Sequence, residues 1–336
     1  MVTDRAPDIY VPLMLPKGHG YPLWLPDPLS NLPPAYLSRG TQIGDLGYLA
    51  DDGGFVYLFN VCKDADDPVN LNRVPPGFVP LTSNSNLGVL ERLEMHDKNS
   101  TITTSAVEQK SIEFDVSAEA PTALGAGCGF EFTSSSEQGA VLVLPDGGER
   151  YDCASLDMFE EYAIANAHSW YKYLNGQGQG RQIRNGMLYL VTGCDKCYSW
   201  GNACYSHLTQ SRCASLKFLT TGVAELSGTL RYRWEVQSGV HKRSHHRDMT
   251  PGAIANQTVF LRGYSISVRE SSALRLLLGV KTVKVSKSDM TNCKQLRAES
   301  RVPYATEQRN VVLATTGMST SGTTQVIPLA PFYKVV

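Results

Sequence analysis

The feature that most constrains the fold is a strict alternation of apolar and polar residues over positions 111–120, which read SIEFDVSAEA. Successive side chains of a β-strand point to opposite faces of a sheet, so this pattern predicts a strand with one wet face. Residues 130–132 (FEF) alternate in the same way after a glycine-rich stretch. We therefore predict that segments 111–120 and 128–134 pair as a hairpin.

A second β-rich stretch, residues 186–206, reads GMLYLVTGCDKCYSWGNACYS. Its first run, 187–192, is apolar or β-branched at nearly every position, which indicates a strand buried on both faces. A Gly/Asp turn at 193–196 and a second run ending at Tyr205 predict another hairpin. We expect this hairpin to lie at the centre of a twisted sheet, packed under the helix described next.

One long amphipathic helix is predicted at residues 155–174. Ser155 is a good N-cap, and Asn175-Gly176 ends the pattern. The apolar positions recur at intervals of three and four, which places on one face Leu156, Phe159, Ala163, Ala167, Trp170 and Leu174. Strands on both sides of a single helix predict an α+β fold with a large, mostly antiparallel twisted sheet.

The first 34 residues are rich in proline, with eight prolines between positions 7 and 34. Proline interrupts helices and is excluded from central strands, so we predict a Pro-rich extended arm over residues 1–40. The α+β sheet domain is expected at 41–293. A polar tail at 294–336 is expected to dock back as an edge strand.

Charge is unevenly distributed along the chain. Residues 1–230 hold 15 Lys and Arg against 26 Asp and Glu, whereas residues 231–309 hold 15 against 6. A basic rear third of this kind can meet anionic lipid, nucleic acid or the acidic front of the same molecule. Nucleic acid is not expected as a partner, because no basic stripe with interleaved aromatic residues is visible.

The N-terminal sequence lacks a charged segment followed by an apolar one, and no window of 18 apolar residues occurs. We therefore expect a cytoplasmic protein without a membrane-spanning helix. Eight cysteines in such a chain are expected to be reduced thiols.

Common enzyme motifs are not found: the sequence has no G-x-S-x-G, H-E-x-x-H or P-loop pattern. We expect no cofactor. The one candidate metal site has the spacing of a tetrahedral zinc site and comprises Cys194, Cys197, Cys204 and His207. On a strand, however, residues three apart point to opposite faces, and buried cysteine is common as a small apolar residue. Core thiols are the simpler interpretation, and a zinc-containing enzyme is kept as an alternative function.

Basic residues cluster in a predicted loop at 241–247, which reads HKRSHHR. This loop suits an anionic surface, with contacts that strengthen as its histidines protonate. A solvated loop explains the same residues equally well. In the strand before it, Arg231 and Arg233 alternate with apolar residues and are expected to face outward.

Several of these segments, taken in order, resemble the pore-forming domain of the gasdermins, in particular the short fungal gasdermin-like proteins. The alternating hairpin, a short apolar strand at 140–144 and the amphipathic helix are followed by LYLVT at 188–192, which is similar to the LYVVT run of that family. TVFLRGYSISV at 258–268 resembles a later gasdermin strand. The chain is also similar to proteins of unknown activity from mushroom-forming fungi.

The gasdermin resemblance implies a protein that oligomerises on anionic membranes and permeabilises them in cell death, moving from the cytoplasm to the membrane on activation. Strands 111–134 and 187–205 would refold into membrane hairpins, and an all-β span must close on itself through several copies. The C-terminal tail or the N-terminal arm would inhibit membrane permeabilisation until the protein is activated. The residues expected to enter the membrane are Ile112, Phe114, Val116, Phe130, Phe132, Leu188 and Leu190. Those expected to touch lipid headgroups are Arg231, Arg233, Lys242, Arg243 and Arg247. The alternative is a non-enzymatic binding module, lectin-like or protein-binding.

Overall fold

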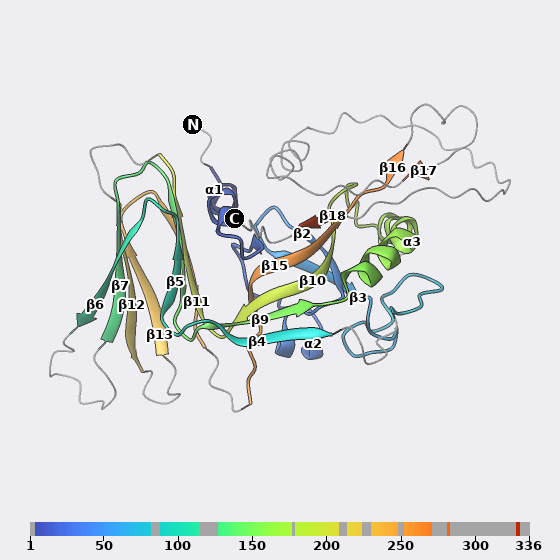
Figure 1. The fold of residues 1–336 in the computed structure, drawn as a ribbon, viewed down its shortest axis with the longest axis horizontal. Coiled ribbons are helices and arrows are strands. Elements are labelled where there is room, and N and C mark those ends of the chain that lie inside the picture. Colours follow the sequence, from blue (N-terminus) through green and yellow to red (C-terminus); the bar gives the residue numbers. More distant parts are fainter. Residues whose placement is uncertain are drawn as a thin grey trace.

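The computed structural model describes residues 4–81, 88–114, 127–176, 179–207, 214–223, 230–247, 252–270, 281–282 and 327–329. Over these residues the fold is α+β, as predicted: the named strands pair antiparallel, and one long helix, α3 (Leu156–Asn175), lies at one end of the molecule (Figure 1). A two-stranded sheet of β16 (Arg269–Glu270) and β17 (Lys281–Thr282) lies apart from the larger sheets.

The main sheet is organised around β10 (Leu188–Cys197), which pairs with β15 (Gln257–Ile266) along its whole length. On its other side, β10 pairs first with β2 (Asp45–Leu49) and then with β9 (Gly148–Cys153). The remaining strands of this sheet are β3 (Phe55–Asn60) on β2, β4 (Val89–His96) on β9, and both β1 (Tyr21–Pro22) and β18 (Ile327–Leu329) on β15. Part of the predicted tail thus pairs with the main sheet, while the division into arm, sheet domain and tail stays a prediction.

Two four-stranded sheets form a sandwich beside the main sheet (Figure 1). The middle sheet has the order β14 (Val240–His245), β11 (Trp200–Tyr205), β8 (Gly139–Leu144), β5 (Ser100–Thr103). The outer sheet has the order β13 (Leu230–Val236), β12 (Ala214–Val223), β7 (Gly127–Ser134), β6 (Glu108–Phe114). Four connections join the main and middle sheets: β4 to β5, β8 to β9, β10 to β11 and β14 to β15.

The predicted hairpin at 186–206 is wrong. β10 continues through 193–196 with two bulges, and β11 then enters the middle sheet without pairing with β10. Bulges bend a strand and let it change partners without ending it. A Cβ at Gly193 would lie 2.2 Å from Oδ1 of Asp152, so a larger residue at the bend would have to displace this carboxylate, which bonds to Arg262. The prediction that this strand is central to a twisted sheet is confirmed.

The N-terminal segment is not a purely extended arm. Ala6–Met14 forms helix α1, and shorter turns follow at η1 (Leu15–Lys17) and α2 (Pro34–Arg39). Pro7 lies in the first turn of α1, where its missing N–H is not needed, while Pro12 lies inside the helix. Packing offsets this cost: Tyr10, Val11 and Met14 are buried against the middle sheet. The sandwich therefore has three layers: α1, the middle sheet and the outer sheet.

Helix α3 covers one face of the main sheet, as predicted. Its stripe from Phe159 to Leu174 is buried in one cluster with Leu188 and Leu190 of β10. Leu156 departs from the predicted stripe, since it lies in the first turn and is 42% exposed. Among the helices in the described part of the chain, none is long and apolar enough to cross a membrane.

Candidate functional site

The outer sheet consists of two adjacent hairpins, and the connections between their paired strands lie at the same end of the sheet. β6 and β7 pair from Glu108↔Thr133 to Phe114↔Gly127, and β12 and β13 pair from Leu216↔Val236 to Val223↔Leu230. β7 and β12 join the hairpins through an antiparallel ladder. The predicted pairing of the two segments is confirmed for residues 111–114, which lie opposite 127–130, while Val116 lies outside the described residues. Segment 187–205 does not join this sheet, so the second hairpin is 214–236.

One face of the outer sheet, which we call the sandwich face, is strongly apolar. Its side chains pack against Val141, Val143, Ala203 and Tyr205 of the middle sheet. Aromatic rings dominate the contact, with ring centroids 6.1 Å apart for Phe132 and Trp234 and 5.4 Å apart for Phe218 and Tyr232. The buried residues of this face are Phe132, Ala214, Leu216, Phe218, Tyr232 and Trp234, with Phe130 partly buried.

The opposite face of the outer sheet, which we call the polar face, is charged and hydroxylated. Glu131 of β7 lies 3.8 Å from Nζ of Lys217 on β12 and accepts a hydrogen bond from Ser215. On β13, Arg233 pairs with Glu235. Period-two alternation along β7, β12 and β13 therefore gives one apolar face and one mainly polar face, with Leu219 on the polar face opposite Arg233.

Strand β6 does not follow the pattern of its neighbours. Ile112 lies opposite Gly129, whereas Ser111 lies opposite Phe130. Cross-strand partners share a face, so Ile112 and Phe130 lie on opposite faces of the sheet. In this register the apolar residues of β6 and β7 therefore do not form one common face. Phe114 lies opposite Gly127.

Four of the five basic residues predicted to touch lipid gather on one edge of the sandwich. Arg231 and Arg233 of β13 and Lys242 and Arg243 of β14 are all exposed. We call these four residues the cationic edge. Residues 241–245 are an edge strand and not the predicted loop; they pair with Trp200–Cys204. Edge strands tolerate polar and charged side chains on both faces. For this reason the sequence of 241–245 lacks the alternating apolar residues that identify a strand.

The segment around β14 also covers the free edge of β13. Nζ of Lys242 donates to the carbonyl of Trp234 (2.9 Å), and the indole N–H of Trp234 donates to the carbonyl of Arg243 (3.0 Å). The amide of Tyr232 donates to Nδ1 of His246 (3.0 Å), which requires this nitrogen to be unprotonated. Burial, His245 and Arg231 all lower the pKa of His246 and favour that state.

Arg247 lies apart from the cationic edge. Its Nη1 is 3.2 Å from Asp146, and its guanidinium lies 4.3 Å from the ring centroid of Tyr198. These contacts hold it at the junction between the main and middle sheets. Leu188 and Leu190 also lie away from the outer sheet, under α3.

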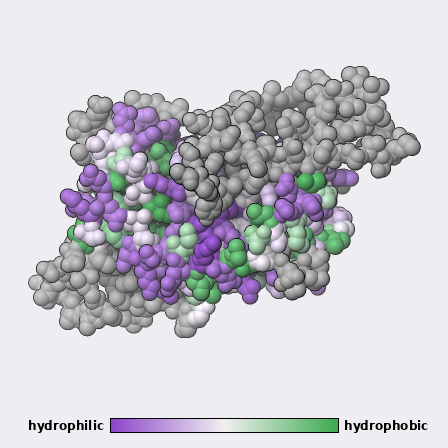
Figure 2. Space-filling model, viewed as in Figure 1, coloured by the Kyte–Doolittle hydropathy of each residue, from purple (hydrophilic) through white to green (hydrophobic). Residues whose placement is uncertain are grey.

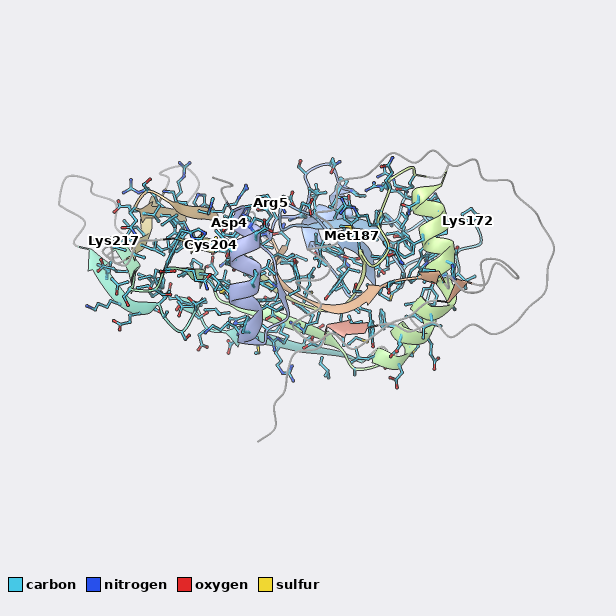
Figure 3. All side chains as sticks on the ribbon, turned by 90° about the horizontal axis from the view of Figure 1, so that it is seen from above. Asp4, Arg5, Lys172, Met187, Cys204 and Lys217 are labelled. Carbon is cyan, nitrogen blue, oxygen red and sulfur yellow. The ribbon has the colours of Figure 1, made fainter. Side chains whose placement is uncertain are left out.

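The structure does not bring the four predicted zinc ligands together. Cys194 lies in one core cluster and Cys197 and Cys204 in another, all at most 1% exposed, as expected for core thiols. Sγ of Cys204 lies beside the start of α1, 3.5 Å from the carbonyl of Ala6 (Figure 3). The side chain of His207 is 84% exposed and pairs with Asp4.

A buried ionic cluster lies on the main sheet next to its junction with the sandwich. Asp195 of β10 is fully buried and lies directly opposite Arg150 of β9. Arg150 donates to both carboxylate oxygens, from Nε at 2.9 Å and from Nη2 at 2.8 Å. Arg262 of β15 donates to Oδ1 at 2.7 Å, and Nε2 of His96 donates to Oδ2 at 2.9 Å.

The same cluster fastens the N-terminal segment to the main sheet. Nη2 of Arg150 donates to Nδ1 of His19 (3.1 Å), and Nη1 of Arg262 donates to the His19 carbonyl (2.8 Å). Burial would raise the pKa of Asp195, but hydrogen bonds from His96 and Arg150 and the charge of Arg262 hold it well below its usual range. Burial, reinforced by His96, lowers the pKa of His19 to about 4.

His19, His96 and Asp195 are the one group in the described part of the chain whose ligand atoms lie close enough for a shared metal ion. Two guanidinium groups already bond to Asp195, and one of them also occupies Nδ1 of His19. A metal cation there would displace or face two fixed positive charges at short range. The group is better explained as a closed ion-pair network that joins four strands, β4, β9, β10 and β15, to the N-terminal segment.

Sequence reasoning missed this cluster. The one visible signal was Asp195 itself, which with Lys196 interrupts a mostly apolar run and requires a partner if it is buried. Its partners lie 45, 67 and 99 residues away in the chain, and no local pattern identifies them. Searches against known proteins add no further clue: no protein-family model and no curated protein matches the sequence.

Proposed function

We propose that this protein permeabilises anionic membranes. The cationic edge binds the lipid surface, the sandwich opens, and the two hairpins of the outer sheet enter the bilayer. The observation that carries the proposal is the outer sheet itself: two adjacent hairpins open at one end and separate an apolar face from a polar one. The resemblance to gasdermin-like proteins supports the same conclusion.

The faces of the outer sheet match what an inserted sheet needs. Strands that cross a bilayer take about 9–11 residues, with apolar side chains toward lipid and polar ones toward water. β12 spans 10 residues, whereas in the described part of the chain β7 spans 8 and β6 and β13 span 7 each. The sandwich face, rich in Phe, Tyr and Trp, would exchange the middle sheet for lipid. The polar face, with Glu131, Lys217 and Arg233, would line a water-filled pore.

Opening would also permit self-association. No lone sheet edge is stable in lipid, so neighbouring copies must pair edge to edge. In the closed protein, Lys242 and His246 bond to the β13 backbone and keep that edge from pairing. Separation of the middle and outer sheets would free the backbone groups of β13 to pair with a neighbouring copy. In water, separation would expose both apolar faces, which keeps the protein closed until it reaches a membrane.

Strand β6 must change register on insertion. A shift of one residue against β7 moves every side chain of β6 to the other face and brings Ile112 to the side of Phe130. As an edge strand with a single described neighbour, β6 can shift without breaking a second ladder.

Dye release from vesicles tests the proposal. Vesicles of phosphatidylcholine containing cardiolipin or phosphatidylserine are filled with a self-quenched dye and mixed with the full chain, before and after limited proteolysis. We expect release from anionic vesicles in at least one of these states and little release from pure phosphatidylcholine. No release from anionic vesicles in either state would end the proposal.

A further inference from the structure

Among the strands that the structure describes, β4 lies at an edge of the main sheet. Among the described strands its one neighbour is β9, and that ladder is interrupted between Arg92 and His96. Three apolar side chains of β4 lie open to solvent: Val89 is 45% exposed, Leu90 49% and Leu93 61%. Figure 2 shows hydrophobic surface along the lower border of the main sheet, where Figure 1 places β4. An exposed edge with apolar side chains is a template for pairing with another strand.

The sequence of β4, VLERLEMH, is complementary to itself in one register. When two copies of a strand pair antiparallel about a two-fold axis, one central residue lies opposite the same residue of the second copy. The residue before the centre in one copy then lies opposite the residue after the centre in the other copy. Centred on Leu93, this geometry places Arg92 opposite Glu94 of the second copy, and Glu94 opposite Arg92. The two leucines meet at the centre, between two pairs of opposite charge.

The neighbouring symmetric registers are unfavourable. Centred on Arg92, the pair would bring two guanidinium groups together, and centred on Glu94, it would bring two carboxylates together. Like charges directly opposite each other destabilise a sheet, whereas opposite charges contribute roughly 0.2–1 kcal/mol a pair. Charged residues on an edge ordinarily discourage pairing with unrelated strands. On β4 the same charges disfavour both registers next to the one centred on Leu93.

We propose that two copies of this protein form a dimer by antiparallel pairing of β4 with β4, centred on Leu93. The dimer joins the two main sheets into one continuous sheet. It forms without lipid and leaves the outer sheet and the cationic edge free, so it goes beyond the proposed membrane function and does not depend on it.

Charge reversal tests the register. We expect sedimentation velocity of the full chain, without lipid, to show a concentration-dependent dimer. Arg92→Glu and Glu94→Arg each turn two attractive pairs into two repulsive ones, so each should raise the dimer dissociation constant by about tenfold or more. The double variant R92E/E94R should restore the dimer. Glu91→Arg is the matched control, because Glu91 faces Met95 of the second copy and its reversal should have little effect.

A cross-linking experiment is independent of these charges, which matters because Arg92 also lies 3.8 Å from Asp152. With Leu93→Cys, mild oxidation should give a covalent dimer on a non-reducing gel. Leu90→Cys should not, since Leu90 faces His96 of the second copy. A monomer at all concentrations, a double variant that stays monomeric, or cross-linking through residue 90 and not residue 93 would each overturn the proposal. A dimer that releases no dye from vesicles would leave it intact and end only the membrane function.

Discussion

Replacing Asp195 with asparagine is expected to lower the free energy of unfolding by about 3–5 kcal/mol, the range for removal of one partner from a buried ion pair. The substitution keeps the size of the side chain but removes its charge. Arg150 and Arg262 are 5% and 4% exposed, so their positive charges would stay buried beside a neutral amide. His96 would also lose a charged acceptor. Urea unfolding followed by circular dichroism measures the change.

The matched control for this prediction is Asp66→Asn. Asp66 is exposed, and surface substitutions of this kind usually change stability by less than about 0.5 kcal/mol. A loss below about 1 kcal/mol for the Asp195 variant would contradict the account of the cluster as the fastening of β9, β10 and β15. The same result would remove its assigned role in holding the N-terminal segment.

Neutralising the cationic edge is expected to weaken binding to anionic vesicles by about a thousandfold. The variant carries glutamine at positions 231, 233, 242 and 243. Each basic residue near an anionic surface contributes about 1 kcal/mol, so four contribute about 4 kcal/mol. Co-sedimentation with phosphatidylserine vesicles at low salt measures binding. Binding of the unchanged protein should also fall as salt is raised, because exposed charges are screened.

A second quadruple variant provides the control for net charge. Arg73, Lys98, Arg181 and Arg184 are exposed residues outside the sandwich edge, and their replacement by glutamine removes the same total charge. This control should bind vesicles within a few-fold of the unchanged protein. Equal losses for the two variants would show that binding follows net charge and that the cationic edge has no special role.

The sequence predicts well those elements whose pattern repeats locally. Alternation along β13 correctly assigns Tyr232 and Trp234 to the core and Arg231 and Arg233 to solvent. The three- and four-residue spacing of Phe159, Ala163, Ala167 and Trp170 likewise identifies the buried side of α3. In both cases the period of the side chains within one element determines which of them are buried.

Features that depend on distant partners are the ones the sequence misses. Glycine and aspartate at 193–196 predict a turn. In the structure Gly193 lies at a bulge of β10, and Asp195 forms ion pairs with residues of β9 and β15. α1 is stable despite Pro12 because the middle sheet covers it. β14 has no apolar period because it is an edge. In each case tertiary contacts override local preference.

The central claim is that the outer sheet inserts into the membrane. Fluorescence quenching at alternate residues of the outer sheet, measured with the protein bound to vesicles, tests this claim most directly. A fluorescent amino acid is introduced singly at Phe130 and Leu216 on the sandwich face, and at Glu131 and Ser215 on the polar face. On anionic vesicles, we expect a lipid-borne quencher to reach the first two positions, and iodide in water to reach the other two. Without vesicles, position 216 should be shielded from both quenchers, and the partly buried position 130 should be reached by iodide but not by the lipid-borne quencher. Positions 130 and 216 that stay shielded from the lipid-borne quencher when vesicles are added, or quenching without alternation, would contradict insertion of the outer sheet.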